Sequence, residues 1–65
     1  MLTVRKLKDL LQYLLEENCD YICDEAKLKK GLIIQDFKEV GILADNTGIQ
    51  LTADGKKFYI TITDF

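Results

Sequence analysis

The side chains that most often do chemistry in proteins are scarce in this chain. It has two cysteines, Cys19 and Cys23, no histidine and no serine. Without histidine the commonest general base is missing, and neither a Ser-His nor a Cys-His pair can be assembled. A cysteine nucleophile needs a basic neighbour or a helix N-terminus, but these two stand among Asp20, Asp24 and Glu25, which disfavour the thiolate. We therefore expect no catalytic site and no enzymatic activity.

The same two cysteines are the best candidates for metal ligands. A C-x₃-C pair supplies two thiolates, whereas a structural zinc site needs four ligands, usually thiolate or imidazole, and the chain has no others. No EF-hand spacing is present, and the glycines form no phosphate-binding motif. We expect no metal and no cofactor, and take Cys19 and Cys23 as free thiols in or near the core.

Length and composition are typical of one small folded domain covering residues 1–65. The chain is 48% apolar and 31% charged and has no proline, which argues against disorder. A domain of this size lies near the lower limit for folding unaided, so oligomerisation or a partner chain is a common source of extra stability.

Charge and hydropathy indicate in which cellular compartment the protein is expected. No apolar run approaches the roughly 20 residues that span a bilayer, and Arg5, Lys6 and Lys8 stand where the apolar stretch of a signal peptide would begin. We expect a cytoplasmic protein without membrane contact. The net charge of −2 argues against nucleic acid as the main partner, because phosphate contacts favour a basic protein.

The first element is predicted to be an amphipathic helix over residues 3–17. Leucines at 3–4 residue spacing form one face, with Leu7, Leu11 and Leu14 at its centre. Thr3 is a suitable N-cap, and Asn18 can end the helix in a left-handed conformation. The helix charges oppose its dipole, since basic residues come first and acidic residues last. This opposition either marks a functional surface or is tolerated on a solvated face.

The middle of the chain is predicted to hold one or two short helices. Residues 24–30 place acids first and lysines last before Gly31, as a short helix prefers, with a brief strand at residues 21–23 as an option. Ile33, Phe37 and Val40 then follow helical spacing up to Gly41, which predicts a third helix.

The C-terminal third is predicted to be an antiparallel β-meander. Asp54-Gly55 is a strong type I′ hairpin signal. It sets Leu51 opposite Phe58 and Ile49 opposite Ile60, all on one face, with strands at residues 49–52 and 57–63. A further strand is expected at residues 42–44. The fold class is therefore α+β, with the Leu7, Leu11 and Leu14 face packed on Leu51, Phe58 and Ile60.

Two resemblances to known proteins bear on function. FKEVGIL at residues 37–43 and GIQLTADGKKF at residues 48–58 resemble the end of a winged-helix domain, where a recognition helix closes on a Gly-Leu-Ile-like turn and a Leu-Thr-x-x-Gly-Lys segment follows the wing. The opening MLTVRKL is similar in style to small uncharacterised proteins of phages and mobile elements. The first resemblance implies a nucleic-acid-binding regulator, and the second implies an accessory or inhibitory binding role.

The leading hypothesis is a non-catalytic protein-binding module, with another protein or a second copy as its partner. Its expected surface is the outer face of the sheet, formed by Leu43, Gln50, Tyr59 and Thr61. An ordinary solvated face rich in threonine, or a face covered by helix residues such as Tyr13, is an alternative. The final strand is expected to be a free sheet edge.

The competing hypothesis is nucleic-acid binding through lysines. The expected contacts are Lys27, Lys30, Lys38, Lys56 and Lys57, the last two at the hairpin tip as a wing. The acidic Asp36 and Glu39 beside Lys38 make the candidate recognition helix a poor fit to DNA.

Overall fold

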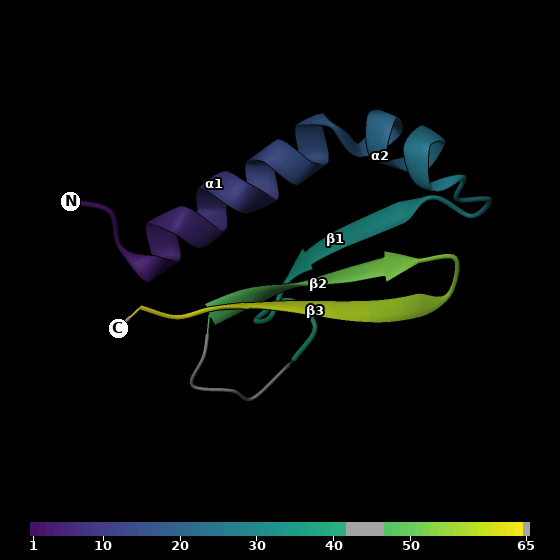
Figure 1. The fold of residues 1–65 in the computed structure, drawn as a ribbon. Helices are drawn as coiled ribbons and strands as arrows, with labels where there is room; N and C mark the ends of the chain where they lie inside the picture. The colour runs from purple at the N-terminus through teal and green to yellow at the C-terminus, as the bar shows by residue number, and fades with distance from the viewer. Residues whose placement is uncertain (42–46, 65) are drawn as a thin grey trace.

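Figure 1 shows the fold in a computed structural model, in which residues 1–41 and 47–64 are described. Two helices, α1 (Val4–Glu17) and α2 (Cys19–Ala26), precede a three-stranded antiparallel sheet of β1 (Leu32–Asp36), β2 (Thr47–Ala53) and β3 (Lys56–Ile62). The predicted α+β class is confirmed. None of the helices in the described part of the chain is long and apolar enough to span a bilayer.

The long helix α1 forms where the leucine spacing predicts it. Thr3 is its N-cap, and its hydroxyl accepts a hydrogen bond from the Lys6 amide at 3.1 Å. The end differs from the prediction, because Asn18 has φ −107° rather than a left-handed conformation. Asn18 instead donates from both its backbone and its side-chain nitrogen to the Leu14 carbonyl. Since the Asn18 carbonyl accepts from the Ile22 amide, α2 follows almost without a break.

The second helix begins five residues earlier than expected, and the strand considered at residues 21–23 is wrong. α2 ends at Ala26, where Lys27 adopts the left-handed conformation that helix ends require. Residues 28–30 therefore lie outside the helix, in the connection to β1.

The predicted third helix over residues 33–40 is also wrong. Its first part is strand β1, which pairs with β2 so that Ile34 lies opposite Leu51 and Asp36 opposite Ile49. Its last part is a turn that follows Asp36. The recognition helix implied by the winged-helix resemblance is thus replaced by a strand and a turn. The strand expected at residues 42–44, which includes Leu43, lies outside the described residues.

The predicted hairpin is confirmed in turn and register. Asp54 and Gly55 have φ values of 49° and 82°, as a type I′ turn requires. Leu51 pairs with Phe58, Ile49 with Ile60 and Gln50 with Tyr59.

Helix α1 lies across one face of the sheet and packs mainly on β1 and β2. On that face the middle strand is covered, and Ile49 is fully buried. The β3 side chains of the same face are less protected, since Phe58 is 52% exposed and Ile60 37% exposed. The expected packing of α1 on Phe58 and Ile60 is therefore incomplete, because α1 lies nearer to β1 and β2 than to β3.

Candidate functional site

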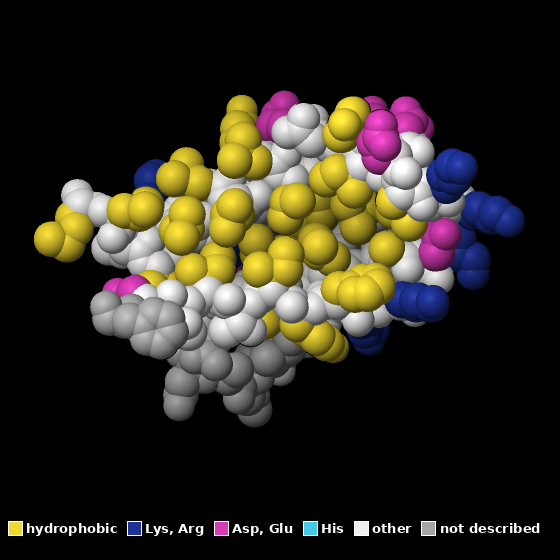
Figure 2. Space-filling view, viewed as in Figure 1, with side chains coloured by type: hydrophobic (Ala, Val, Ile, Leu, Met, Phe, Trp, Pro, Cys, Tyr) yellow, Lys and Arg dark blue, Asp and Glu magenta, His cyan; other side chains and the backbone are white. Residues whose placement is uncertain are grey.

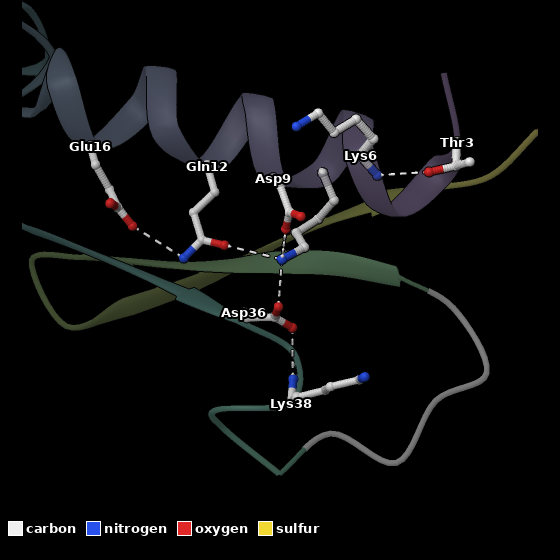
Figure 3. Close-up of polar contacts among 8 residues, drawn as sticks. Thr3, Lys6, Asp9, Gln12, Glu16, Asp36 and Lys38 are labelled. Atoms are coloured by element: carbon white, nitrogen blue, oxygen red, sulfur yellow. Dashed lines mark hydrogen bonds and ion pairs between the residues drawn. The ribbon is translucent and has the colours of Figure 1, made fainter. Parts of the chain in front are cut away.

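The most concentrated polar cluster joins α1 to the end of β1. The ammonium nitrogen of Lys8 lies 2.5 Å from Asp36 Oδ2, 2.6 Å from Asp9 Oδ1 and 3.4 Å from Gln12 Oε1. Gln12 donates in turn to Glu16, and Asp36 Oδ1 accepts from the Lys38 amide. Figure 3 shows this chain of contacts running along the helix on its β1 side. Sequence reasoning missed it, although Lys8 follows Val4 by four residues and precedes Leu11 by three, on the face that packs on the sheet.

The electrostatics of this cluster favour charged, paired groups. Desolvation alone would lower the pKa of Lys8, but hydrogen bonds to Asp36 and Asp9 outweigh it, so the pKa is raised. The hydrogen bond from Lys8 lowers the pKa of Asp36, and the Lys38 amide lowers it further. A nucleophilic or basic lysine needs a lowered pKa. The arrangement therefore positions α1 rather than activating Lys8.

The cysteines lie close together on α2 as free, half-buried thiols. Desolvation, then the neighbouring Cys19, raises the pKa of the Cys23 thiol. The Cys19 thiol donates a weak hydrogen bond to the Leu32 carbonyl at 3.7 Å, which holds α2 over the start of β1. Within the described ranges, no group of three or more His, Cys, Asp or Glu side chains is arranged to hold a metal ion.

The expected protein-binding surface on the outer sheet face is only partly available. Tyr59 and Thr61 are exposed, but Gln50 is only 6% exposed. Where Leu43 was expected beside Gln50, the structure places Gln35. The alternative in which Tyr13 covers this face is wrong, since Tyr13 is exposed on α1, which lies across the opposite face.

Phe37 lies on this outer face instead. Its ring packs edge-to-face on Tyr59, with centroids 6.2 Å apart. It also occupies the space that a side chain at Gly48 would fill. Glycine at position 48 thus permits the turn after β1 to fold back on the outer face.

A larger apolar surface lies between α1 and β3, the last strand of the sheet. Figure 2 shows hydrophobic side chains gathered over α1 and toward the sheet below it. Four strongly apolar residues of these two elements are exposed, namely Leu10, Leu14, Phe58 and Ile60. We call these four residues the open face. Because the polar contacts of α1 lie on its β1 side, its exposed leucines remain for the β3 side.

The lysines form a second candidate surface at one end of the molecule. Asp54 in the β2–β3 turn accepts hydrogen bonds from the Lys29 and Lys30 amides at 3.1 and 2.6 Å. These bonds bring the segment after α2 against the hairpin tip, and Figure 2 shows Lys and Arg side chains gathered at that end. Of the expected nucleic-acid contacts, Lys27, Lys30, Lys56 and Lys57 come together there. Lys38 lies apart, after the opposite end of β1.

Comparisons with known proteins identify no relative of this chain. No protein-family model, no curated protein and no solved structure gives a significant match to the chain.

Proposed function

We propose that the chain is a non-catalytic protein-binding module that acts through its open face. The observation that carries the proposal is the exposure of Leu10, Leu14, Phe58 and Ile60, at 43%, 54%, 52% and 37%, on two neighbouring elements. Single exposed apolar side chains are ordinary, whereas a contiguous apolar patch marks an interaction site. Aromatic side chains such as Phe58 are also enriched in protein interfaces relative to the rest of the surface.

Phe58 and Tyr59 offer a matched pair for testing this function. They are neighbours on β3 with similar exposures of 52% and 57%, but they point to opposite faces of the sheet. Phe58→Ala is expected to weaken binding of the protein partner about thirtyfold, as a central interface residue does. Tyr59→Ala is expected to change it little. Both effects are measured as the amount of partner protein that the immobilised chain and each variant capture. Further copies of the chain itself count as partners.

The opposite outcome would favour the surface expected from the sequence. If Tyr59→Ala weakens binding and Phe58→Ala does not, the outer face is the binding surface and the open face is ordinary exposed area. If neither change affects any partner, the proposed function is wrong.

A second candidate function is nucleic-acid binding, and the convergence of four expected lysines at the hairpin tip favours it. Lys57→Glu reverses a charge inside this cluster, and Lys38→Glu makes the same change outside it. If the cluster binds phosphates, Lys57→Glu weakens binding to a duplex and flattens its salt dependence, while Lys38→Glu has a smaller effect. A gel-shift titration at low salt measures this, and no binding by the unchanged chain removes the candidate.

A further inference from the structure

We propose that the partner of the open face is a second copy of this chain, joined by antiparallel pairing of β3 with β3. The inference rests on the function proposed above, because it names the protein that the open face binds. The two copies would share one six-stranded sheet, with both α1 helices on the same side of it.

The outer edge of β3 is open for such pairing. β3 is the last strand of the sheet, and among the described residues no strand pairs with its outer edge. The two-residue turn makes Ala53 and Lys56 a hydrogen-bonded pair. By alternation, Lys57, Tyr59 and Thr61 direct their backbone N–H and C=O groups outward. Edge strands are normally guarded by a charge, a proline or a bulge. Lys56 and Lys57 carry charge at the start of β3, whereas residues 58–63 contain no charge and no proline.

The sequence of β3 is complementary to itself in one register. With Ile60 on the two-fold axis, Phe58 lies opposite Ile62 of the second copy, and Tyr59 lies opposite Thr61. At the ends, Lys56 lies opposite Asp64, so opposite charges meet on both sides of the axis. A shift by two residues in one direction sets Lys56 against Ile62, and in the other sets Phe58 against Asp64. Only the central register matches apolar with apolar and cation with anion, as a two-fold interface requires.

The chain exposes more surface than a compact monomer of the same mass. The chain of 7.5 kDa exposes 5118 Å², whereas a compact monomer of that mass exposes about 4,250 Å². The excess is about 870 Å² over the whole surface, and a standard interface buries roughly 800 Å² on each partner. The radius of gyration, 12.4 Å, also exceeds the about 10.7 Å expected for a compact chain of this length.

Pairing through β3 also covers the open face. The two copies place Phe58 and Ile60 side by side in one apolar strip between the two helices, and Leu10 and Leu14 line that strip. A peptide strand from another protein could satisfy the same edge, but it would not supply a matched second helix or the Lys56–Asp64 pairs.

Sedimentation equilibrium of the purified chain tests the proposal. We expect the mass to rise from 7.5 kDa toward twice that value as concentration is raised from about 1 µM to about 500 µM. Thr61→Pro removes an N–H that points outward from β3, and is expected to raise the dissociation constant about tenfold or more. Thr61→Ala keeps the N–H and is the matched control. Circular dichroism checks that each variant remains folded.

A charge exchange tests the register without proline. Lys56→Glu alone and Asp64→Lys alone are each expected to raise the dissociation constant about tenfold, because two attractive pairs become repulsive. The double variant Lys56→Glu/Asp64→Lys is expected to restore dimerisation. Lys57→Glu, which lies opposite Thr63 of the second copy, is expected to change it less.

The outcomes separate this inference from the proposed function. A mass of one chain at every concentration overturns the inference, while the proposed function survives if a different protein still binds in a manner that depends on Phe58. A dimer that Thr61→Pro does not weaken, or that the charge exchange does not restore, overturns the β3 register. A dimer that follows both sets of variants supports the inference.

Discussion

Lys8 is a charged side chain in the packed face of α1, only 4% exposed. Its stem lies along the sheet and its ammonium group reaches Asp36 at the end of β1. Burying a charge is costly unless it is paired, and the three polar partners of Lys8 supply that pairing. The position of α1 over β1, and hence the exposure of the β3 side chains, follows from this contact.

We expect Lys8→Met to lower the free energy of unfolding by about 1–2 kcal/mol, because Asp36 is left without its buried cation. The cost stays below that of a fully enclosed pair, since Asp36 keeps the Lys38 amide. Lys6→Met, the same change on the exposed side of α1, is expected to cost less than about 0.5 kcal/mol. Urea denaturation measures both. Equal costs for the two variants would show that the buried ion pair does not hold α1.

The same pair gives stability a defined pH dependence. The folded pKa of Asp36 is lowered, so its contribution is present above the usual value of 3.8 and is lost as pH falls through the lower folded value. The folded pKa of Lys8 is raised, so its contribution is present below 10.5 and is lost as pH rises through the higher folded value. Lys8→Met should reduce the loss of unfolding free energy both at low pH and at high pH, as measured by urea denaturation across pH. If the loss at low pH is the same in Lys8→Met, that loss comes from other carboxyl groups.

At the level of elements, the hairpin tip does more than reverse the chain. The Asp54 carboxylate accepts from the Lys30 and Lys29 amides, and these bonds lower the pKa of Asp54. The turn between β2 and β3 thereby organises the connection between α2 and β1, which is distant in sequence.

We expect Asp54→Asn to leave the turn intact and loosen this connection. Asparagine tolerates positive φ as aspartate does, but its amide provides one acceptor oxygen where the carboxylate provides two. Hydrogen exchange of the Lys29 or Lys30 amide should rise about tenfold, while exchange in α1 stays unchanged. Glu17→Gln, a similar change on α1, is the control. Unchanged exchange at both lysines would contradict the role of Asp54.

The elements that local rules determine could be predicted from the sequence. The leucine spacing and Thr3 define α1, and Asp54-Gly55 fixes the register of β2 and β3. β1 could not be predicted in this way, because Ile33, Phe37 and Val40 also fit helical spacing. Its conformation is decided by pairing with β2, more than ten residues away, and no local pattern reports that pairing. The error in β1 then carried over to the candidate surface, where Leu43 was expected beside Gln50.

At the scale of the whole molecule, the small size of the apolar core limits the stability of the fold. Among the described residues only Phe37, Ile49 and Ile62 are buried apolar side chains. The sequence indicates a domain near the lower size limit and the use of a partner, but not the location of the interface. That location depends on where α1 lies across the sheet, and the contact between Lys8 and Asp36 holds α1 on the β1 side.

The unguarded edge of β3 also affects how the protein should be handled. An edge strand with a Phe-Tyr-Ile-Thr-Ile sequence and outward-pointing backbone groups is a template for open-ended stacking into fibrils. Pairing of two copies around a two-fold axis would cover the edge of β3. The other edge strand, β1, ends in the polar residues Gln35 and Asp36, which disfavour such stacking. Lys56→Glu weakens the dimer but keeps the outward backbone groups of β3, whereas Thr61→Pro removes one of them. Concentrated samples of Lys56→Glu are therefore expected to precipitate on storage sooner than those of Thr61→Pro.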